Sequence, residues 1–335
     1  MEGTVMPPRT IRFLSGEDVR NSLPMAEAIE IMKRAFAQLS SGQVSLPPRT
    51  QLDLSGQRGI ALFMPSYSPA AERVGIKIIT LCGDNPPRGL PRIQALMCVL
   101  DSITGTPLAI LDGTLLTAIR TGAASGAATD LLARPDASTV AVFGAGVQGR
   151  TQLAAVCAVR PIRKVWIFDA NRELAERFAV ELGPALEVDI QPADSAAQAV
   201  RTADVICTAT TSKTPVFCDP DLRPGVHINA VGSYQPAVQE IPAETVVRAQ
   251  LVVDHRHSAL EETGDLIIPM AQGLFEPDHI HAELGEIVTG CRSGRKSPET
   301  VTLFKSVGVA IQDLAAADHV LRRAEQLGLG TEVPW

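Results

Sequence analysis

The pattern of apolar and polar positions predicts a helix followed by a run of short strands in the first third of the chain. Between Met25 and Leu39, apolar residues recur with i, i+3, i+4 spacing, which is typical of an amphipathic helix that ends at Ser41-Gly42. From Arg49 to Leu111, short apolar runs are separated by Gly, Pro and Asn, which predicts an antiparallel sheet of consecutive strands. The expected strands are residues 50–54, 60–65, 74–81, 94–101 and 107–112.

A different rhythm begins after Leu115. The run LLTAIRTGAASGAATDLLA is rich in small residues at helical spacing and predicts a long, closely packed helix at a domain junction. Strand-like and helical stretches then alternate, as in a doubly wound parallel sheet. The expected strands are residues 139–143, 164–169, 205–208, 227–231 and 251–254, and residues 304–327 are predicted to form a final helix that returns to the first part. The predicted fold class is therefore α/β, with a parallel sheet and a discontinuous α+β domain.

Composition limits the kinds of partner. Lys and Arg number 30 against 37 for Asp and Glu, and the resulting net charge of −7 disfavours nucleic acid as a partner. No stretch approaches the roughly 18 continuous apolar residues of a membrane span, and the N-terminal residues do not resemble a signal peptide, so a cytoplasmic location without membrane contact is expected. The six cysteines form no CxxC pair, and the histidine pairs His255/His257 and His279/His281 lack further ligands at zinc-like spacing, so no metal site is expected.

The sharpest local signal is a glycine-rich turn between a strand and a helix. The segment TVAVFGAGVQGRTQLAAVCA places Gly144, Gly146 and Gly149 in the GxGxxG spacing of the Rossmann dinucleotide site, where the helix N-terminus offers N–H groups to a pyrophosphate. Asp169 ends the next strand, 20 residues past the last glycine (169 − 149), where a carboxylate accepts hydrogen bonds from ribose hydroxyls. NAD is therefore favoured over NADP, although Arg172 nearby can soften that preference. The alternative is that the glycines only shape a loop.

Beyond this turn, the chain resembles the ornithine cyclodeaminase and mu-crystallin family over nearly its whole length. The matching stretches are GIKIITLCGDNPPRGLPRIQALMCVLDSITGTPLAILDGTLLTAIRTGAASG, VAVFGAGVQG, ADVICTAT, INAVGSYQP and VTLFKSVGVAIQDLAAA. The resemblance implies an NAD(H)-dependent oxidoreductase that transfers hydride to or from the alpha carbon of a small imino or amino acid. It also implies a homodimer, with a substrate and dimerisation domain in residues 1–130 completed by a helix in 308–335, and a Rossmann domain in 131–307.

By the same resemblance, Arg49, Lys77 and Arg120 hold the substrate carboxylate. Guanidinium groups suit carboxylates, and each of these cations has apolar neighbours in the sequence, although each can also be an ordinary surface or loop cation. Lys77 is expected to give or take the proton, together with Arg120 in the catalytic set, because desolvation and nearby arginines lower the pKa of a lysine. Ser233 is expected near the substrate, and the residues expected around the cofactor are Thr121, Gly144, Gly146, Val147, Gln148, Gly149, Asp169, Thr208, Ala209, Thr210, Val231 and Ser306.

One departure from the family pattern narrows the reaction. The cyclodeaminases carry an aspartate that assists deamination and ring closure, and the resemblance places Tyr234 at that position. A phenol with an ordinary pKa of about 10 is a poor base at neutral pH. The sequence therefore favours a reductase of imines such as pyrroline-2-carboxylate, or an amino acid dehydrogenase. An ornithine or lysine cyclodeaminase and a non-catalytic binding protein of the mu-crystallin type remain as alternatives.

Overall fold

The computed structural model describes residues 10–54 and 59–335, which form two compact units. Unit 1 contains the described parts of residues 1–24, 42–117 and 310–335, and unit 2 contains residues 25–41 and 118–309. The division falls inside the long helix, between Thr117 and Ala118, whereas the sequence placed the boundary after residue 130. The helix Met25–Ser40 groups with unit 2, because it packs on two other helices of that unit.

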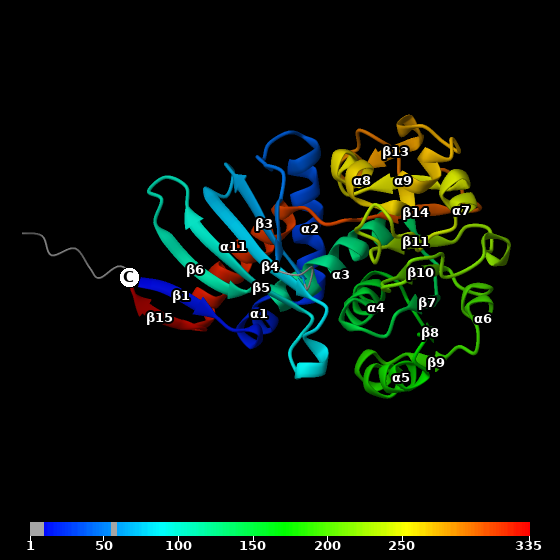
Figure 1. The fold of residues 1–335 in the computed structure, drawn as a ribbon, viewed down its shortest axis with the longest axis horizontal. Helices are drawn as coiled ribbons and strands as arrows, with labels where there is room; N and C mark the ends of the chain where they lie inside the picture. The colour runs from blue at the N-terminus through cyan, green and yellow to red at the C-terminus, as the bar shows by residue number, and fades with distance from the viewer. Residues whose placement is uncertain (1–9, 55–58) are drawn as a thin grey trace, which may run out of the picture. The chain divides into compact units, whose positions relative to one another are not determined.

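Unit 1 is a twisted sheet with helices on one of its faces (Figure 1). Its elements are β1 (Thr10–Leu14), α1 (Gly16–Ser22), β2 (Thr50–Leu54), β3 (Gly59–Ser68), β4 (Arg73–Cys82), η2 (Pro86–Arg88), β5 (Ile93–Asp101), β6 (Pro107–Asp112), the start of α3 (Gly113–Leu132), α11 (Ala310–Leu327) and β15 (Thr331–Pro334). The sheet order is β15-β1-β6-β5-β4-β3-β2. Strands β2 to β6 pair antiparallel with their sequence neighbours, which confirms the predicted run of consecutive strands. Helix α11 packs on β3, β4 and β5.

Local sequence explains where the first helix begins. The Ser15 hydroxyl accepts a hydrogen bond from the Asp18 backbone N–H at 3.2 Å, and the Asp18 carboxylate accepts one from the Ser15 N–H at 2.9 Å. This reciprocal capping box satisfies two N–H groups that the helix cannot pair internally. The helix therefore begins directly after Ser15, at Gly16.

The final helix ends at Leu327, as the predicted range 304–327 requires, but it begins later than predicted. Phe304 and Lys305 belong to a buried strand, β14 (Thr302–Lys305), and the helix α11 begins only at Ala310. A short apolar run is compatible with a buried strand as well as with a helix, so periodicity alone did not separate the two. At the other end, the helix does not continue to residue 335: Gly328 and Gly330 adopt positive φ values of 66° and 83°, and the chain returns as β15, antiparallel to β1.

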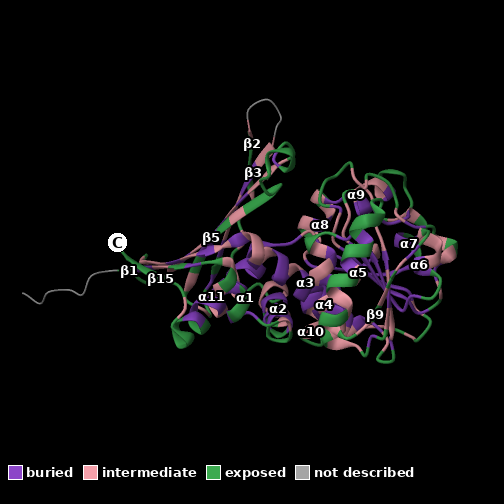
Figure 2. Ribbon diagram, turned by 90° about the horizontal axis from the view of Figure 1, so that it is seen from below, coloured by how far each residue is buried: buried purple, intermediate pink, exposed green. Residues whose placement is uncertain are grey.

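Unit 2 is a doubly wound sheet of parallel strands with helices on both faces. Its strands are β7 (Thr139–Phe143), β8 (Lys164–Phe168), β9 (Asp189–Pro192), β10 (Val205–Thr208), β11 (His227–Ala230), β12 (Gln250–Val253), β13 (Ile280–Glu283) and β14, in the order β13-β12-β14-β11-β10-β7-β8-β9. Its helices are α2 (Met25–Ser40), the rest of α3, α4 (Val147–Val159), α5 (Arg172–Leu186), α6 (Ala196–Val200), η3 (Asp219–Asp221), α7 (Ala243–Arg248), α8 (Arg256–Glu262), α9 (Gly264–Ala271), η4 (Pro277–His279) and α10 (Leu284–Val288). Figure 2 shows the central strands as buried and the outward helix faces as exposed. The strand order reverses direction between β7 and β10, which defines a topological switch point.

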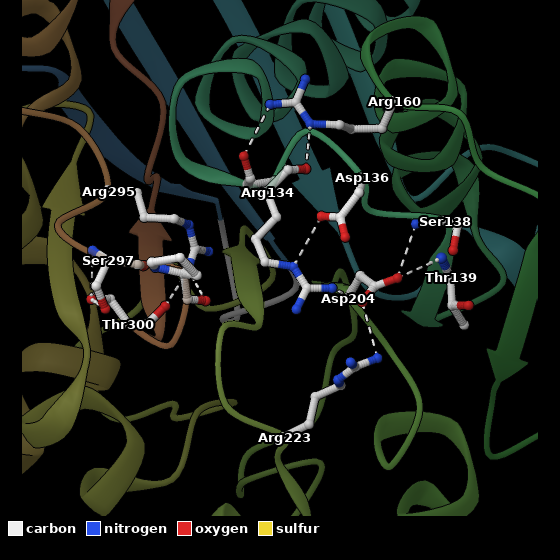
Figure 3. Close-up of polar contacts among 12 residues, drawn as sticks. Arg134, Asp136, Ser138, Thr139, Arg160, Asp204, Arg223, Arg295, Ser297 and Thr300 are labelled. Atoms are coloured by element: carbon white, nitrogen blue, oxygen red, sulfur yellow. Dashed lines mark hydrogen bonds and ion pairs between the residues drawn. The ribbon is translucent and has the colours of Figure 1, made fainter.

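At the amino ends of these strands, charged side chains fix the end of α3 to the sheet (Figure 3). The guanidinium group of Arg160 donates to the carbonyls of Thr129 and Asp130 at 2.9 and 2.8 Å, in the last turn of the helix. The buried carboxylate of Asp204 accepts from the backbone N–H groups of Ser138 and Thr139 at 2.9 and 3.1 Å, and also from Arg134 and Arg223. The guanidinium group of Arg160 thus satisfies carbonyl groups at the end of α3 that have no partner within the helix. Its positive charge also suits the negative pole of the helix.

Neither a membrane span nor a metal centre emerges from the part of the chain that the structure describes. No described helix has the length and apolarity that crossing a bilayer requires. Among the same residues, no three His, Cys, Asp or Glu side chains are grouped so that they could hold a metal ion.

One buried histidine of unit 2 predicts a loss of stability in acid. His227 is fully buried, its ring nitrogens lie 2.9 Å from Thr302 Oγ1 and 3.1 Å from Asn229 Oδ1, and burial lowers its pKa to about 3. Between that value and about 6.5, the unfolded chain binds a proton that the folded chain does not. The contribution of His227 is therefore fully present above pH 6.5 and is lost as the pH falls, by about 1.4 kcal/mol per unit.

Urea unfolding of the wild type and of His227→Gln at several pH values between 7 and 4 measures this effect. The free energy of unfolding of the wild type is expected to fall more steeply with acid than that of the variant. Equal slopes would show that His227 does not carry the linkage.

Candidate functional site

The glycine-rich turn joins β7 to α4 in unit 2 and has the backbone geometry that a dinucleotide site needs. Gly144 has a φ of 98°, and a Cβ there would lie 2.5 Å from the carbonyl oxygen of Ala209. A Cβ on Gly149 would overlap the carbonyl oxygen of Gly144, so this residue lets helix and strand pack closely. A Cβ on Gly146, by contrast, would meet no atom within 4 Å. The space above Gly146 is therefore open for a ligand to approach the backbone.

The start of α4 offers that ligand unpaired N–H groups. Gly146 is the N-cap and provides no side-chain cap, Val147 is 63% exposed, and Gln148 is half-buried. The positive pole of this 13-residue helix thus meets the open space at Gly146. Both observations fit a pyrophosphate group.

Asp169, directly after β8, lies beside the turn. Its carboxylate accepts hydrogen bonds from the backbone N–H groups of Ala145 and Asn171, each at 2.8 Å. Arg172, the residue that could soften a preference for NAD, is instead bonded to Glu176 and Asp194, at 3.1 and 2.6 Å. The acidic group therefore lies where the sequence placed it, fixed against the glycine turn.

On the other side of the switch point, Thr208 ends β10, Ala209 and Thr210 follow it, and Val231 follows β11. The Thr208 hydroxyl is buried and has no hydrogen-bond partner within residues 10–54 and 59–335. Thr121, on α3, accepts a hydrogen bond at its carbonyl from the Gln152 side chain of α4 at 3.3 Å. The residues expected around the cofactor thus come from both sides of the turn.

Arg120 and Ser306 lie in unit 2 near a turn that is held by an aspartate, Asp254, which the sequence analysis did not single out. Arg120 is 5% exposed, and a Cβ on Gly308 would lie 2.8 Å from its Nη1 atom. One oxygen of the buried Asp254 carboxylate accepts from the Ser306 hydroxyl and from the N–H groups of Val307 and Gly308, at 2.7 to 2.9 Å. Asp254 therefore shapes the turn that lies against the Arg120 guanidinium. The sequence feature that indicates this role is the position of Asp254 directly after the buried strand β12.

Lys77 and Arg49 lie in unit 1. Lys77 points inward from the middle of β4, and its Nζ lies 2.7 Å from Asp313 Oδ2 on α11, with side-chain exposures of 2% and 0%. The sequence analysis missed Asp313. Its place in the apolar run AIQDLAAA indicates a buried carboxylate, and a buried carboxylate needs a cation as its partner. Arg49 is half-buried and immediately precedes β2.

Ser233 and Tyr234 follow Val231 on the same loop but differ in environment. Ser233 is fully buried, and its hydroxyl contacts the Val238 carbonyl at 2.5 Å and Thr263 Oγ1 at 3.0 Å. Tyr234 is 39% exposed. The Ser233 hydroxyl is thus used to shape its own loop.

A doubly wound parallel sheet, with a glycine turn at its switch point and a carboxylate after the second strand, defines a dinucleotide-binding protein of the Rossmann class. A model of the ornithine cyclodeaminase/mu-crystallin family matches residues 10–327. The chain belongs to this family, which confirms the resemblance found in its sequence motifs.

Three relatives illustrate the range of the family. The Delta(1)-pyrroline-2-carboxylate reductase of Bacillus cereus (strain ATCC 10987 / NRS 248) is 40% identical over 321 residues, covering 96% of this chain and 98% of the relative. The structure of the corresponding Thermococcus litoralis enzyme in complex with NADH and L-proline has a TM-score of 0.93 and 42% identity, covering 96% and 100% of the two chains. An archaeal alanine dehydrogenase dimer with bound NAD has a TM-score of 0.91 and 32% identity, covering 97% and 99%.

Asp169 predicts a preference between nicotinamide cofactors. Asp169→Asn retains an oxygen that can accept from the Ala145 N–H but removes the negative charge that repels a 2′-phosphate. We expect the ratio of the NADPH and NADH dissociation constants to fall by about 10-fold. Titration of cofactor fluorescence measures both constants, and Glu173→Gln, on the neighbouring first turn of α5, is the control. An unchanged ratio in Asp169→Asn would show that this carboxylate does not face the ribose.

Proposed function

We propose that this protein is an NADH-dependent reductase of small cyclic imino acids, with Δ1-pyrroline-2-carboxylate as the substrate of first choice. The observation that carries the proposal is the match, over 96% of the chain, to a reductase whose complex holds NADH and L-proline. L-proline is the product expected when the C=N bond of Δ1-pyrroline-2-carboxylate gains a hydride at carbon and a proton at nitrogen. The fit of the glycine turn to a pyrophosphate supports the cofactor.

We assign the cofactor to unit 2. Gly144, Gly146, Val147, Gln148 and Gly149 are proposed to bind the pyrophosphate, Asp169 the adenosine ribose, and Thr121, Thr208, Ala209, Thr210, Val231 and Ser306 the nicotinamide half. When bound, NADH supplies the hydride that reduces the alpha carbon. The backbone N–H groups of α4 bind and orient the cofactor, and burial of the residues on β10 helps to exclude water.

We assign the substrate carboxylate to Arg49, Lys77 and Arg120, with Ser233 shaping the neighbouring loop. Lys77 donates a proton from Nζ to the imine nitrogen, and Asp313 holds Nζ in place at 2.7 Å. The balance is one imine, one NADH and one proton giving one amine and one NAD⁺. In the reverse direction, neutral Lys77 accepts the proton as the amine is oxidised.

Unit 1 is proposed to carry substrate binding and dimerisation, and unit 2 to carry the cofactor. The archaeal alanine dehydrogenase relative supports a homodimer because it is a dimer. The net charge of −7 supports partners other than nucleic acid, and a cytoplasmic location stays a prediction from the sequence.

Reductive amination is the second candidate, because the same relative is an alanine dehydrogenase that shares 32% of its residues with this chain. In that reaction, ammonia and a 2-oxo acid first form the imine that is then reduced. The cyclodeaminase alternative is less well supported, since the position of its aspartate is filled by the partly exposed phenol of Tyr234.

A spectrophotometric panel separates these reactions. NADH consumption at 340 nm is followed with pyrroline-2-carboxylate, piperideine-2-carboxylate, and pyruvate with ammonia, while ornithine with NAD is assayed for ammonia and proline. The highest kcat/KM is expected with a cyclic imine. Ammonia and proline from ornithine without net NADH would contradict the proposal in favour of a cyclodeaminase, and NADH binding without turnover in any well would favour a binding protein.

A further inference from the structure

A buried carboxyl group lies beneath the loops that follow β10 and β11. Glu240, between β11 and α7, is 0% exposed. Its Oε1 atom accepts hydrogen bonds from the backbone N–H and the hydroxyl of Thr210, at 2.7 and 2.5 Å. Its Oε2 atom is buried and has no hydrogen-bond partner among the residues that the structure describes. Glu240 therefore fixes Thr210 through both the backbone and the side chain of that residue.

The same carboxyl group supports the second loop. A Cβ on Gly232 would overlap both oxygens of Glu240, so the backbone after β11 rests directly on the carboxyl group. Burial raises the pKa of Glu240, while the charge of Lys305 and the bonds from Thr210 lower it. A carboxyl group with a raised pKa at this place is neutral more often than an exposed glutamate, which suits a buried oxygen that has no hydrogen-bond partner among the described residues.

Glu240 is itself held by a buried ion pair. Asp265 Oδ1 accepts from the backbone N–H groups of Glu240 and Ile241, at 2.7 and 3.0 Å. Asp265 Oδ2 lies 2.8 Å from Lys305 Nζ at the end of β14, with side-chain exposures of 1% and 0%. Through Asp265, the Glu240 backbone is thus fixed to Lys305 at the end of β14. The Glu240 carboxyl group in turn fixes the two loops.

The topology indicates which half of a dinucleotide these loops meet. Asp169 follows β8 and marks the adenosine side of the glycine turn. The loop after β10 lies on the opposite side, because β8 and β10 flank β7. It lies against the glycine turn, since a Cβ on Gly144 would be 2.5 Å from Ala209 O and 3.4 Å from Thr210 Cγ2. A dinucleotide that crosses the turn therefore extends its nicotinamide half toward Thr210 and Gly232.

We propose that Glu240 is a positioning residue for the nicotinamide half of the cofactor and acts through Thr210 and Gly232. This inference rests on the proposed use of NADH. Glu240 does not touch the reacting atoms; it holds two loops in the arrangement that receives the nicotinamide ribose and ring. The adenosine half, held at Asp169 and α4, does not depend on it.

Comparison of NADH with ADP, which lacks both the nicotinamide ring and its ribose, tests the proposal by calorimetry without any turnover. In Glu240→Leu, which fills the space but cannot accept from Thr210, the dissociation constant of NADH is expected to rise about 10- to 100-fold. That of ADP is expected to stay within about 2-fold of the wild type. Glu240→Asp keeps the carboxyl group but is one methylene shorter. It is expected to weaken NADH binding by less than the leucine variant does, again without weakening binding of the shorter nucleotide. It replaces the leucine variant in the test if that variant does not fold.

Asp204→Asn is the matched control, because Asp204 is a buried carboxylate at the opposite, amino-terminal end of the strands of the same sheet (Figure 3). It is expected to lower the melting temperature without changing the ratio of the two dissociation constants. An equal loss of affinity for NADH and ADP in the Glu240 variants, or unchanged binding of both, would overturn the inference. A wild type that binds NADH but reduces no imine would instead refute the proposed function and leave this inference standing.

Discussion

Replacement of Lys77 by methionine is expected to lower kcat/KM for the NADH-dependent reduction of pyrroline-2-carboxylate by about 1,000-fold or more. The variant loses the proposed proton donor and one cation of the carboxylate site, and proton transfer by a positioned side chain alone is worth roughly 100- to 10,000-fold. NADH affinity is expected to stay within about 3-fold, because the cofactor is assigned to unit 2 and Lys77 lies in unit 1. Initial rates and a fluorescence titration of NADH measure the two effects.

The control for this variant addresses stability. Lys77→Met leaves the buried Asp313 carboxylate without the Lys77 ammonium, and loss of one member of a buried ion pair costs about 3–5 kcal/mol. The double variant Lys77→Met/Asp313→Leu removes both charges and is expected to recover much of the melting temperature while staying inactive. Recovery of activity to within about 10-fold of the wild type in the double variant would show that Lys77 serves packing rather than proton transfer.

Gly146→Val is expected to weaken NADH binding by about 100-fold or more with little loss of stability. Gly146 has a φ of −78°, which any residue adopts, and a Cβ there meets no protein atom within 4 Å. The valine therefore fits the folded chain but occupies the space proposed for the pyrophosphate. The hydrogen bonds that the N–H groups at the start of α4 donate to the charged pyrophosphate are then lost as well. Calorimetry with NADH and thermal melting of the unbound protein measure the two quantities.

Gly149→Ala provides the contrast, because its Cβ would overlap the Gly144 carbonyl oxygen. This variant is expected to lose stability as well as binding, since helix α4 must move away from β7. If Gly146→Val bound NADH within about 3-fold of the wild type, the pyrophosphate would not lie over Gly146.

The strands with strong local patterns were predicted most closely. Residues 50–54, 107–112, 139–143 and 205–208 match the bounds of β2, β6, β7 and β10. Strands β1 and β15 were missed because they pair with distant parts of the chain, β1 with β15 and β6, which no local pattern records. The edge strands β9 and β13 were missed because polar or charged residues interrupt their apolar positions, whereas the equally short β10 is buried throughout.

The same distinction separates the site residues that the sequence revealed from those that it did not. The glycine turn and Asp169 follow from spacing within a single strand-turn-helix-strand unit, so they could be located before the structure was known. Asp313 is 236 positions from Lys77, and Asp265 is 40 from Lys305. Such buried charge pairs depend on how distant elements pack. A lone acidic residue in an apolar segment indicates that a partner exists, but not which residue it is.

The measurement that tests the central claim most directly is isotope transfer from deuterated NADH. The protein is incubated with pyrroline-2-carboxylate and NADH carrying deuterium at the transferable C4 position, and the product is analysed by proton NMR and mass spectrometry. We predict L-proline with one deuterium on the alpha carbon and a matching amount of NAD⁺. Proline without deuterium at the alpha carbon, or NADH left unoxidised while the imine is consumed, would contradict the proposed hydride transfer.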